Sequence, residues 1–206
     1  MAAVEQGLAN LDQHVEIIAS FGKRPVVALN RYPGDSTEEI HCVRDHCEKM
    51  GIPFAVTDHF NRGGAGSLEL AEVVRNTTSD SSPPFHPLYE STDSVKDKIL
   101  TVATKIYGAR DVAYSRSAAR DLREIARLGY TDLPICVAKT HMSLSDNARR
   151  RGRPRDFSIT VEGVRIQAGA GFLVVLTGDM TRMPGLPREP LASAIDLVDD
   201  RIIGMK

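Results

Sequence analysis

The chain has 206 residues, of which 42% are hydrophobic and 26% charged, and its formal net charge is −1. These values exclude a disordered tail, a fibrous protein and a strongly basic protein that binds nucleic acid through its overall field. Three cysteines without a CxxC pair and the lack of a long uncharged apolar run predict a globular cytoplasmic protein, with no disulfide framework, zinc ribbon, export signal or membrane anchor.

The chain opens with a predicted amphipathic helix that ends near Gly22. Its apolar residues are spaced three, four and three positions apart, which places them on one face of a helix. These residues are Leu8, Leu11, Val15 and Ile18.

A βαβ unit is predicted next. The apolar run 25–30 is typical of a strand buried on both faces, Ser36–Glu39 has the pattern of a capping box that begins a helix, and the run 53–56 predicts the second strand. Crossovers of this kind are almost always right-handed, so the two strand ends should open on the same edge of the sheet. Residues 30–32 and 57–66 should therefore share one rim.

The second half repeats the alternation of helices and strands. Residues 76–89 are rich in Ser, Thr and Pro and predict a surface connection, after which capped helices should begin at Ser94 and Ser115. Apolar runs predict buried strands, and a stretch with period two predicts a half-exposed antiparallel strand between them. These three strands are predicted at 133–138, 157–162 and 172–176. The fold class is therefore α/β: a mostly parallel sheet with flanking helices, Rossmann-like βαβ units and a small antiparallel portion near the C-terminus.

Ligands of open α/β sheets bind beyond the carboxyl ends of the strands, which makes four loops candidates: 30–32, 57–67, 139–145 and 177–187. Asn30 offers a donor and an acceptor to a nucleobase edge, or it is a turn residue that bonds its own backbone. Tyr32 and Phe60 should lie on the same rim, where two rings could clasp a planar heterocycle or simply plug the end of the sheet.

Two further segments suggest anion binding without settling it. The glycine-rich stretch 62–67 either lets the backbone approach a ligand or is only flexible, and it is not a Walker A sequence. The run 149–155 holds five arginines, which could grip phosphates or polycarboxylates or form a solvated loop. The six histidines lack HxxxH or HExxH spacing, so we predict no metal site, and we assign no catalytic nucleophile.

Several strings resemble formate–tetrahydrofolate ligases, also called formyltetrahydrofolate synthetases, in order and spacing. The resemblance covers nearly the whole chain but only the C-terminal part of that enzyme. The strings are VALNRY at 27–32, GGAG at 63–66, KIYGA at 105–109, LPICVAKTHMSLSDN at 133–147, GAGF at 169–172 and MPGLP at 183–187.

The resemblance implies a ligase of one-carbon metabolism that makes 10-formyltetrahydrofolate from formate, ATP with Mg²⁺ and tetrahydrofolate, without a prosthetic group. It implies that the pterin ring lies between Tyr32 and Phe60, where the family usually has Phe and Trp. Asn30, together with Arg31, Gly63 and Gly64, would line the nucleotide side or shape the site. The five arginines of 149–155 occupy a variable loop of the family, and a folate polyglutamate tail is a candidate ligand for them.

The resemblance also implies a division of the chain. Residues 1–35 would end a nucleotide domain whose P-loop part is missing, and residues 36–206 would form the C-terminal α/β domain. Alone, the chain should be inactive, and it should pair with an N-terminal P-loop half, with full-length subunits or with another copy of itself. The alternative is a catalytically inactive folate-binding or oligomerisation module, with neither a nucleic-acid nor a membrane partner.

Overall fold

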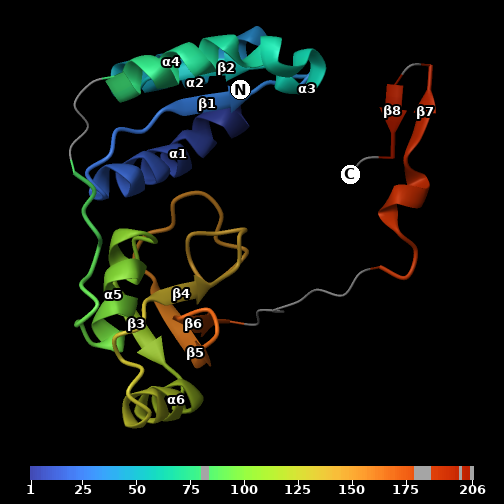
Figure 1. The fold of residues 1–206 in the computed structure, drawn as a ribbon. Helices are drawn as coiled ribbons and strands as arrows, with labels where there is room; N and C mark the ends of the chain where they lie inside the picture. The colour runs from blue at the N-terminus through green and yellow to red at the C-terminus, as the bar shows by residue number, and fades with distance from the viewer. Residues whose placement is uncertain (80–83, 179–186, 200, 205–206) are drawn as a thin grey trace.

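The computed structural model describes residues 1–79, 84–178, 187–199 and 201–204 (Figure 1). The predicted loop 177–187 and the MPGLP string lie mostly outside these residues. No helix in the described part of the chain is long and apolar enough to cross a membrane.

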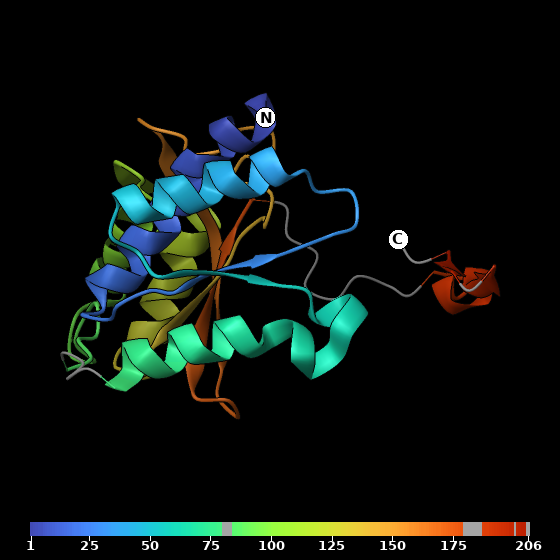
Figure 2. The ribbon, with the colours of Figure 1, turned by 90° about the horizontal axis from the view of Figure 1, so that it is seen from above.

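The N-terminal elements form the predicted helix and βαβ unit. They are α1 (Ala2–Ser20), β1 (Val27–Asn30), α2 (Thr37–Lys49), β2 (Phe54–Thr57), α3 (His59–Arg62), the 3₁₀ helix η1 (Gly63–Ser67) and α4 (Leu68–Ser79). β1 and β2 pair in parallel, with Asn30 opposite Thr57 at their carboxyl ends, which confirms the predicted shared rim. The Ser36 hydroxyl accepts the Glu39 amide proton and the Glu39 carboxylate accepts that of Ser36, so the predicted capping box is present. Figure 2 shows α2 and α4 running beside the two strands.

Two predictions for this region are wrong. The strand at 25–30 is not buried on both faces, because Ala28 and Asn30 are exposed in a two-stranded sheet that the described elements cover incompletely. The connection predicted from residue 76 begins later, because α4 continues to Ser79. On α1, Val15 is buried and Leu8 and Leu11 are half-buried, whereas Ile18 is exposed.

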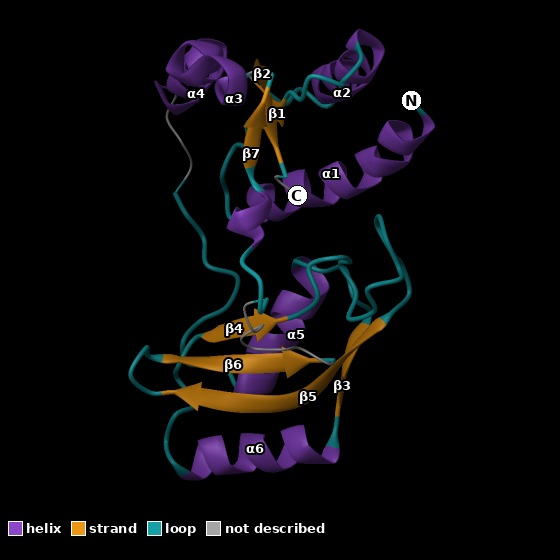
Figure 3. Cartoon of the chain, turned by 90° about the vertical axis from the view of Figure 1, so that its right-hand side faces the viewer, coloured by secondary structure: helices purple, strands orange, loops and turns teal. Residues whose placement is uncertain are grey.

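The second half forms a four-stranded sheet of order β3-β5-β6-β4 (Figure 3). Its elements are α5 (Val95–Lys105), β3 (Asp111–Tyr114), α6 (Arg116–Arg127), β4 (Ile135–Ala138), β5 (Ser158–Gln167) and β6 (Phe172–Thr177). β3 pairs with β5 and β4 with β6 in parallel, while β5 and β6 are antiparallel. The two helices share one core with β5 and β6, built from Val95, Ile99, Ala118, Ile125, Val161, Val164, Leu173 and Val175.

The positions of two strands correct the sequence prediction. β5 is antiparallel to β6 as predicted, but it is an interior strand, because the unpredicted strand β3 pairs with its other side and Ile159 and Val161 are buried. β4 was predicted to be buried, yet it lies at the edge of the sheet and exposes Cys136. The predicted helix caps are present at Ser94 and Ser115, whose hydroxyls each accept an amide proton of the first helical turn.

A lysine ties α5 to the sheet. Lys98 is 0% exposed, and its Nζ donates to the carbonyl oxygens of Ser91, Thr131 and Leu133 at 2.6, 2.8 and 3.2 Å. Burial lowers the pKa of Lys98, and the nearby carboxylates of Asp132 and Asp93 oppose that shift. One ammonium group therefore satisfies three carbonyls from two segments that flank the helix.

The two halves of the chain meet along α1. The buried Gln13 donates from Nε2 to the Ile106 carbonyl at 3.4 Å, and Phe21 stacks on Phe85 with ring centroids 5.5 Å apart. An antiparallel portion near the C-terminus was predicted, and the structure has one in the pair β5–β6 and another in a hairpin that was not located in advance. That hairpin consists of β7 (Asp196–Val198) and β8 (Arg201–Ile203) after the 3₁₀ helix η2 (Leu191–Ala194), and it stands apart from the other elements in Figure 1. The predicted division into 1–35 and 36–206 falls between β1 and β2, which share a sheet, and stays a prediction.

Candidate functional site

The rim begins with Asn30, Arg31 and Tyr32, which follow β1 directly. The Arg31 amide donates to the Thr57 carbonyl at 2.9 Å and so extends the pairing of the strands by one step. A turn then fixes the backbone of Tyr32, whose amide donates to Asp35 Oδ2 at 2.7 Å. The side chain of Asn30 donates from Nδ2 to the Tyr32 hydroxyl at 3.4 Å, so the structure brings these two predicted site residues together.

Phe60 lies on α3, directly beyond β2. The preceding Thr57 is buried, and its hydroxyl hydrogen-bonds with His59 Nδ1 at 3.1 Å and with the Ser67 hydroxyl at 3.0 Å. Asn61 Nδ2 donates to Asp58 Oδ1 at 2.7 Å. Hydrogen bonds of Thr57 and Asn61 therefore fix the backbone on either side of Phe60.

Both predicted rings are exposed. Tyr32 is 61% and Phe60 62% accessible, so neither plugs the end of the sheet. Rings of this exposure at one sheet edge are available to stack on a planar ligand. Their position at one edge of the sheet was predictable, because β1 and β2 were expected to end there.

The glycine stretch is built around a close backbone approach. The Asp58 amide donates to the Gly66 carbonyl at 2.9 Å, and a Cβ on Gly66 would lie 2.3 Å from the Asp58 carbonyl oxygen. Gly63 has a φ of +55°, in the left-handed region that favours glycine, whereas Gly64 has neither constraint. The stretch therefore forms a 3₁₀ turn whose backbone closes on Asp58.

We expect Gly66→Ala to lower the free energy of unfolding by about 2 kcal/mol, because the new methyl group must displace backbone. Gly64→Ala is the matched control, since its Cβ would meet no atom within 4 Å, and it should change stability by less than about 0.5 kcal/mol. Urea unfolding of both variants gives the comparison. Equal midpoints for the two would show that the close approach imposes no constraint.

A polar cavity of about 380 Å³ adjoins the rim, between α2 and α4. Arg31, Arg44 and Arg62 line it together with Asp58 and Glu69. Asp58 and Arg62 fall within the predicted candidate loop 57–67, whereas Arg44 and Glu69 lie outside every predicted site. Ile40 and Arg44 are four residues apart on α2, so both side chains lie on the same helix face and line this cavity. This spacing is the sequence signal that could have indicated Arg44.

The cations of the arginine run 149–155 and of the candidate loop 139–145 are largely used inside the chain. In the arginine run, Arg153 pairs with Glu16, and Arg150 donates to the Arg155 carbonyl at 2.8 Å while lying over the Phe157 ring. In the loop after β4, Lys139 Nζ donates to three carbonyl oxygens of its own segment, so its ammonium is already satisfied. The three carbonyls belong to Thr140, Ser143 and Ser145.

The described residues contain no group of three or more His, Cys, Asp or Glu side chains placed to hold a metal ion. The site that the geometry supports is instead an edge of exposed aromatic rings, with a cationic cavity beside it. Such an edge suits a planar ligand that carries negative charge.

The fold and this edge define an α/β protein with a candidate ligand site beyond the carboxyl ends of parallel strands. The sequence model of the formate–tetrahydrofolate ligases matches residues 1–206, and the chain belongs to that family. It is 45% identical over 207 residues to the formate–tetrahydrofolate ligase of Myxococcus xanthus (strain DK1622). The match covers 98% of this chain and 38% of that relative, so the chain spans little more than a third of the relative's length.

Proposed function

We propose that this chain supplies the pterin-binding wall of an ATP-dependent formate–tetrahydrofolate ligase. The observation that carries the proposal is the pair of exposed rings, Tyr32 and Phe60, at one rim of the β1–β2 sheet. Membership of the ligase family supports the choice of tetrahydrofolate as the planar ligand. Asn30 helps to position Tyr32 through its hydroxyl, and Gly63 and Gly64 shape the opposite loop.

The proposed reaction has two steps. A formate oxygen attacks the γ-phosphorus of ATP, which gives formyl phosphate and ADP; N10 of tetrahydrofolate then attacks the formyl carbon, and inorganic phosphate leaves. The first step needs a cradle for the phosphates and Mg²⁺. The sequence has no GxxxxGK[ST], and its described residues offer no acidic cluster for the ion. We therefore place ATP with Mg²⁺ on a P-loop part of the ligase outside these 206 residues, and the pterin on the residues described here.

Calorimetric titration of tetrahydrofolate into the purified chain under anaerobic conditions tests the pterin site. We expect Tyr32→Ala and Phe60→Ala each to weaken binding about tenfold or more, since each removes a stacking surface and its buried area. Tyr130→Ala, which removes a ring far along the chain on the surface after α6, is the control and should bind like wild type.

Unchanged affinity in both rim variants would contradict the pterin clasp. A second experiment separates the ligase from a non-catalytic folate-binding module. An N-terminal P-loop half of the family is added to the chain, and the formation of 10-formyltetrahydrofolate from formate, ATP and tetrahydrofolate is measured. Folate binding without formyl transfer would favour a non-catalytic folate-binding module.

A further inference from the structure

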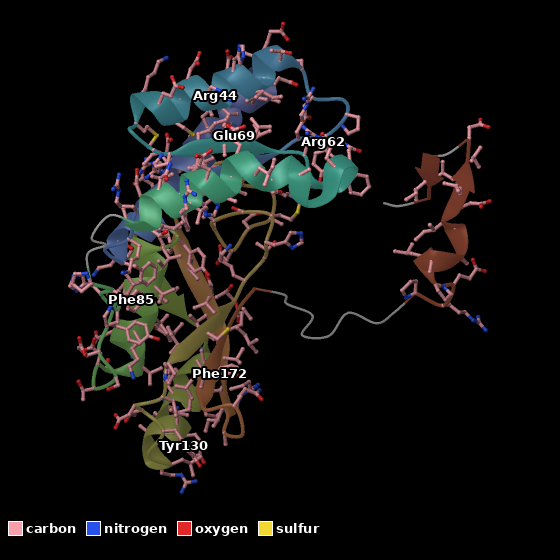
Figure 4. The ribbon with its side chains drawn as sticks, turned by 45° about the horizontal axis from the view of Figure 1, so that its top comes forward. Arg44, Arg62, Glu69, Phe85, Tyr130 and Phe172 are labelled. Carbon is pink, nitrogen blue, oxygen red and sulfur yellow. The ribbon has the colours of Figure 1, made fainter. Side chains whose placement is uncertain are left out.

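A second cavity, apolar and about 780 Å³ in volume, lies where the two halves of the chain meet. Ile17 and Phe21 of α1 form one side of it, and Val102 and Ile106 of α5 form another. The connection that leads into α5 completes the wall, and Figure 4 labels Phe85 on this connection. The volume is that of sites in which proteins hold a small organic molecule.

Contacts between these segments hold the wall of the apolar cavity in place. The His86 amide donates to the Phe21 carbonyl at 3.1 Å, and the Phe21 and Phe85 rings stack with their planes 8° apart. The Tyr89 hydroxyl accepts the Ile135 amide proton at 3.1 Å, which ties the connection to the start of β4. A wall fixed in this way loses little conformational entropy when a ligand binds.

The charged groups at the apolar cavity are acidic. Glu90 and Asp132 are exposed and line it, whereas no Lys, Arg or His among the described residues does. The charge of Lys98 acts on Asp132, but its Nζ is occupied by three backbone carbonyls. Within the described part of the chain the Glu90 carboxylate forms no ion pair and accepts no hydrogen bond. The cavity therefore has an apolar floor and a negatively charged edge that the chain itself does not neutralise.

We propose that this cavity binds a small organic cation, in which an ammonium group is attached to an apolar or aromatic body. The body buries its surface against side chains such as Val102 and Ile106, and the ammonium group lies at Glu90 and Asp132. The ring face of Phe85 attracts a cation as well. An acid with the same body meets two like charges and is rejected. The inference goes beyond the proposed function, because the cavity shares no lining residue with the rim of the β1–β2 sheet.

The test compares two probes with the same body and opposite charge, 4-phenylbutylamine and 4-phenylbutyrate, by calorimetric titration into the chain at neutral pH. At low ionic strength the amine should bind about tenfold more tightly than the acid, and added salt should reduce the difference. Glu90→Gln should weaken binding of the amine about threefold, and Glu90→Gln with Asp132→Asn should remove most of the preference. Glu162→Gln, an exposed glutamate of β5, is the matched control and should change neither affinity.

Two further variants test whether the probes occupy this cavity. Val102→Phe fills part of the volume from α5, and Phe85→Ala removes a ring of the wall, so each should weaken binding of the amine about tenfold. Circular dichroism melts verify that the variants are folded. Phe85 is 59% exposed, so its replacement gives a reading even where Val102→Phe unfolds the chain.

Failure of both probes to bind at millimolar concentrations would overturn the proposal. Equal affinity of wild type for the amine and the acid would overturn it too, as would unchanged binding of the amine in Phe85→Ala. A helical peptide of lysine and leucine that displaces the amine at an about hundredfold lower concentration would show that a protein segment is the better occupant and would overturn the assignment to a small molecule.

Discussion

Lys98→Met should lower the free energy of unfolding by about 4 kcal/mol. The substitution keeps an unbranched apolar stem but removes the ammonium that satisfies the carbonyls of Ser91, Thr131 and Leu133. Because the side chain is fully buried, water cannot replace the lost donors without opening the structure. Urea unfolding followed by far-UV circular dichroism measures the change.

The control for Lys98 is Lys105→Met, at the exposed C-terminal end of the same helix. It should change stability by no more than about 0.5 kcal/mol. A loss in Lys98→Met that is no greater than in the control would mean that the three carbonyls find other donors.

Lys139→Met should lower the free energy of unfolding by about 3 kcal/mol and expose the loop after β4 to solvent exchange. Lys139 donates to three carbonyls within six residues and lies over the Tyr107 ring, 4.9 Å from its centroid. Without it, the chain turn that buries Ser143 and Ser145 loses its central donor. Burial lowers the pKa of Lys139, and Asp146 opposes the shift, as expected for an ammonium held inside the fold.

Hydrogen exchange gives the local readout for Lys139. The amides of Ser145, Asn147 and Arg149 bond within this turn and should lose protection in Lys139→Met. Amides of the distant helix α2 should keep theirs, and Lys49→Met at its exposed end should change neither region. Retained protection at Ser145 and Asn147 would show that the serine hydroxyls alone hold the turn.

The sequence predicted the parts of the fold that depend on local patterns. The βαβ unit and its shared rim followed from two apolar runs and one capping box, all of which the structure contains. β3 was missed because Asp111–Tyr114 is only four residues long and alternates between exposed and half-buried positions. The edge position of β4 was not predictable from its apolar side chains, because strand order depends on pairing with β6, which lies far along the chain.

The candidate site divides in the same way. That Tyr32 and Phe60 follow the ends of one parallel strand pair was predictable, while their role in binding stays a prediction. The polar cavity lined by Arg44 and Arg62 was not predictable, because these residues are separated along the chain and only the crossover brings them to one place. The five arginines at 149–155 were predicted as a possible anion site because they are dense in the sequence. Two of them contact Glu16 and Phe157 instead, so a dense run of charge can have a structural role.

The burial of Lys98 is only weakly indicated by the sequence. It is three residues after Val95 and one before Ile99, both of which face the core, so its position on the helix already lay at the buried face. A charged residue there is compatible with the fold only because backbone oxygens from two flanking segments converge on it.

The two carbonyl-bound lysines give the protein a chemical signature of its folded state. Primary amines react with acylating reagents only when they are accessible and have a free electron pair, and the ammonium groups of Lys98 and Lys139 are engaged on every donor by oxygen atoms. In a pulse of such a reagent, exposed amines such as those of Lys49 and Lys105 should be modified at once. The two engaged lysines should instead be acylated at the rate at which their segments open. Mass spectrometry of the peptides that carry them would then give two opening rates from one experiment, one for α5 and one for the loop after β4.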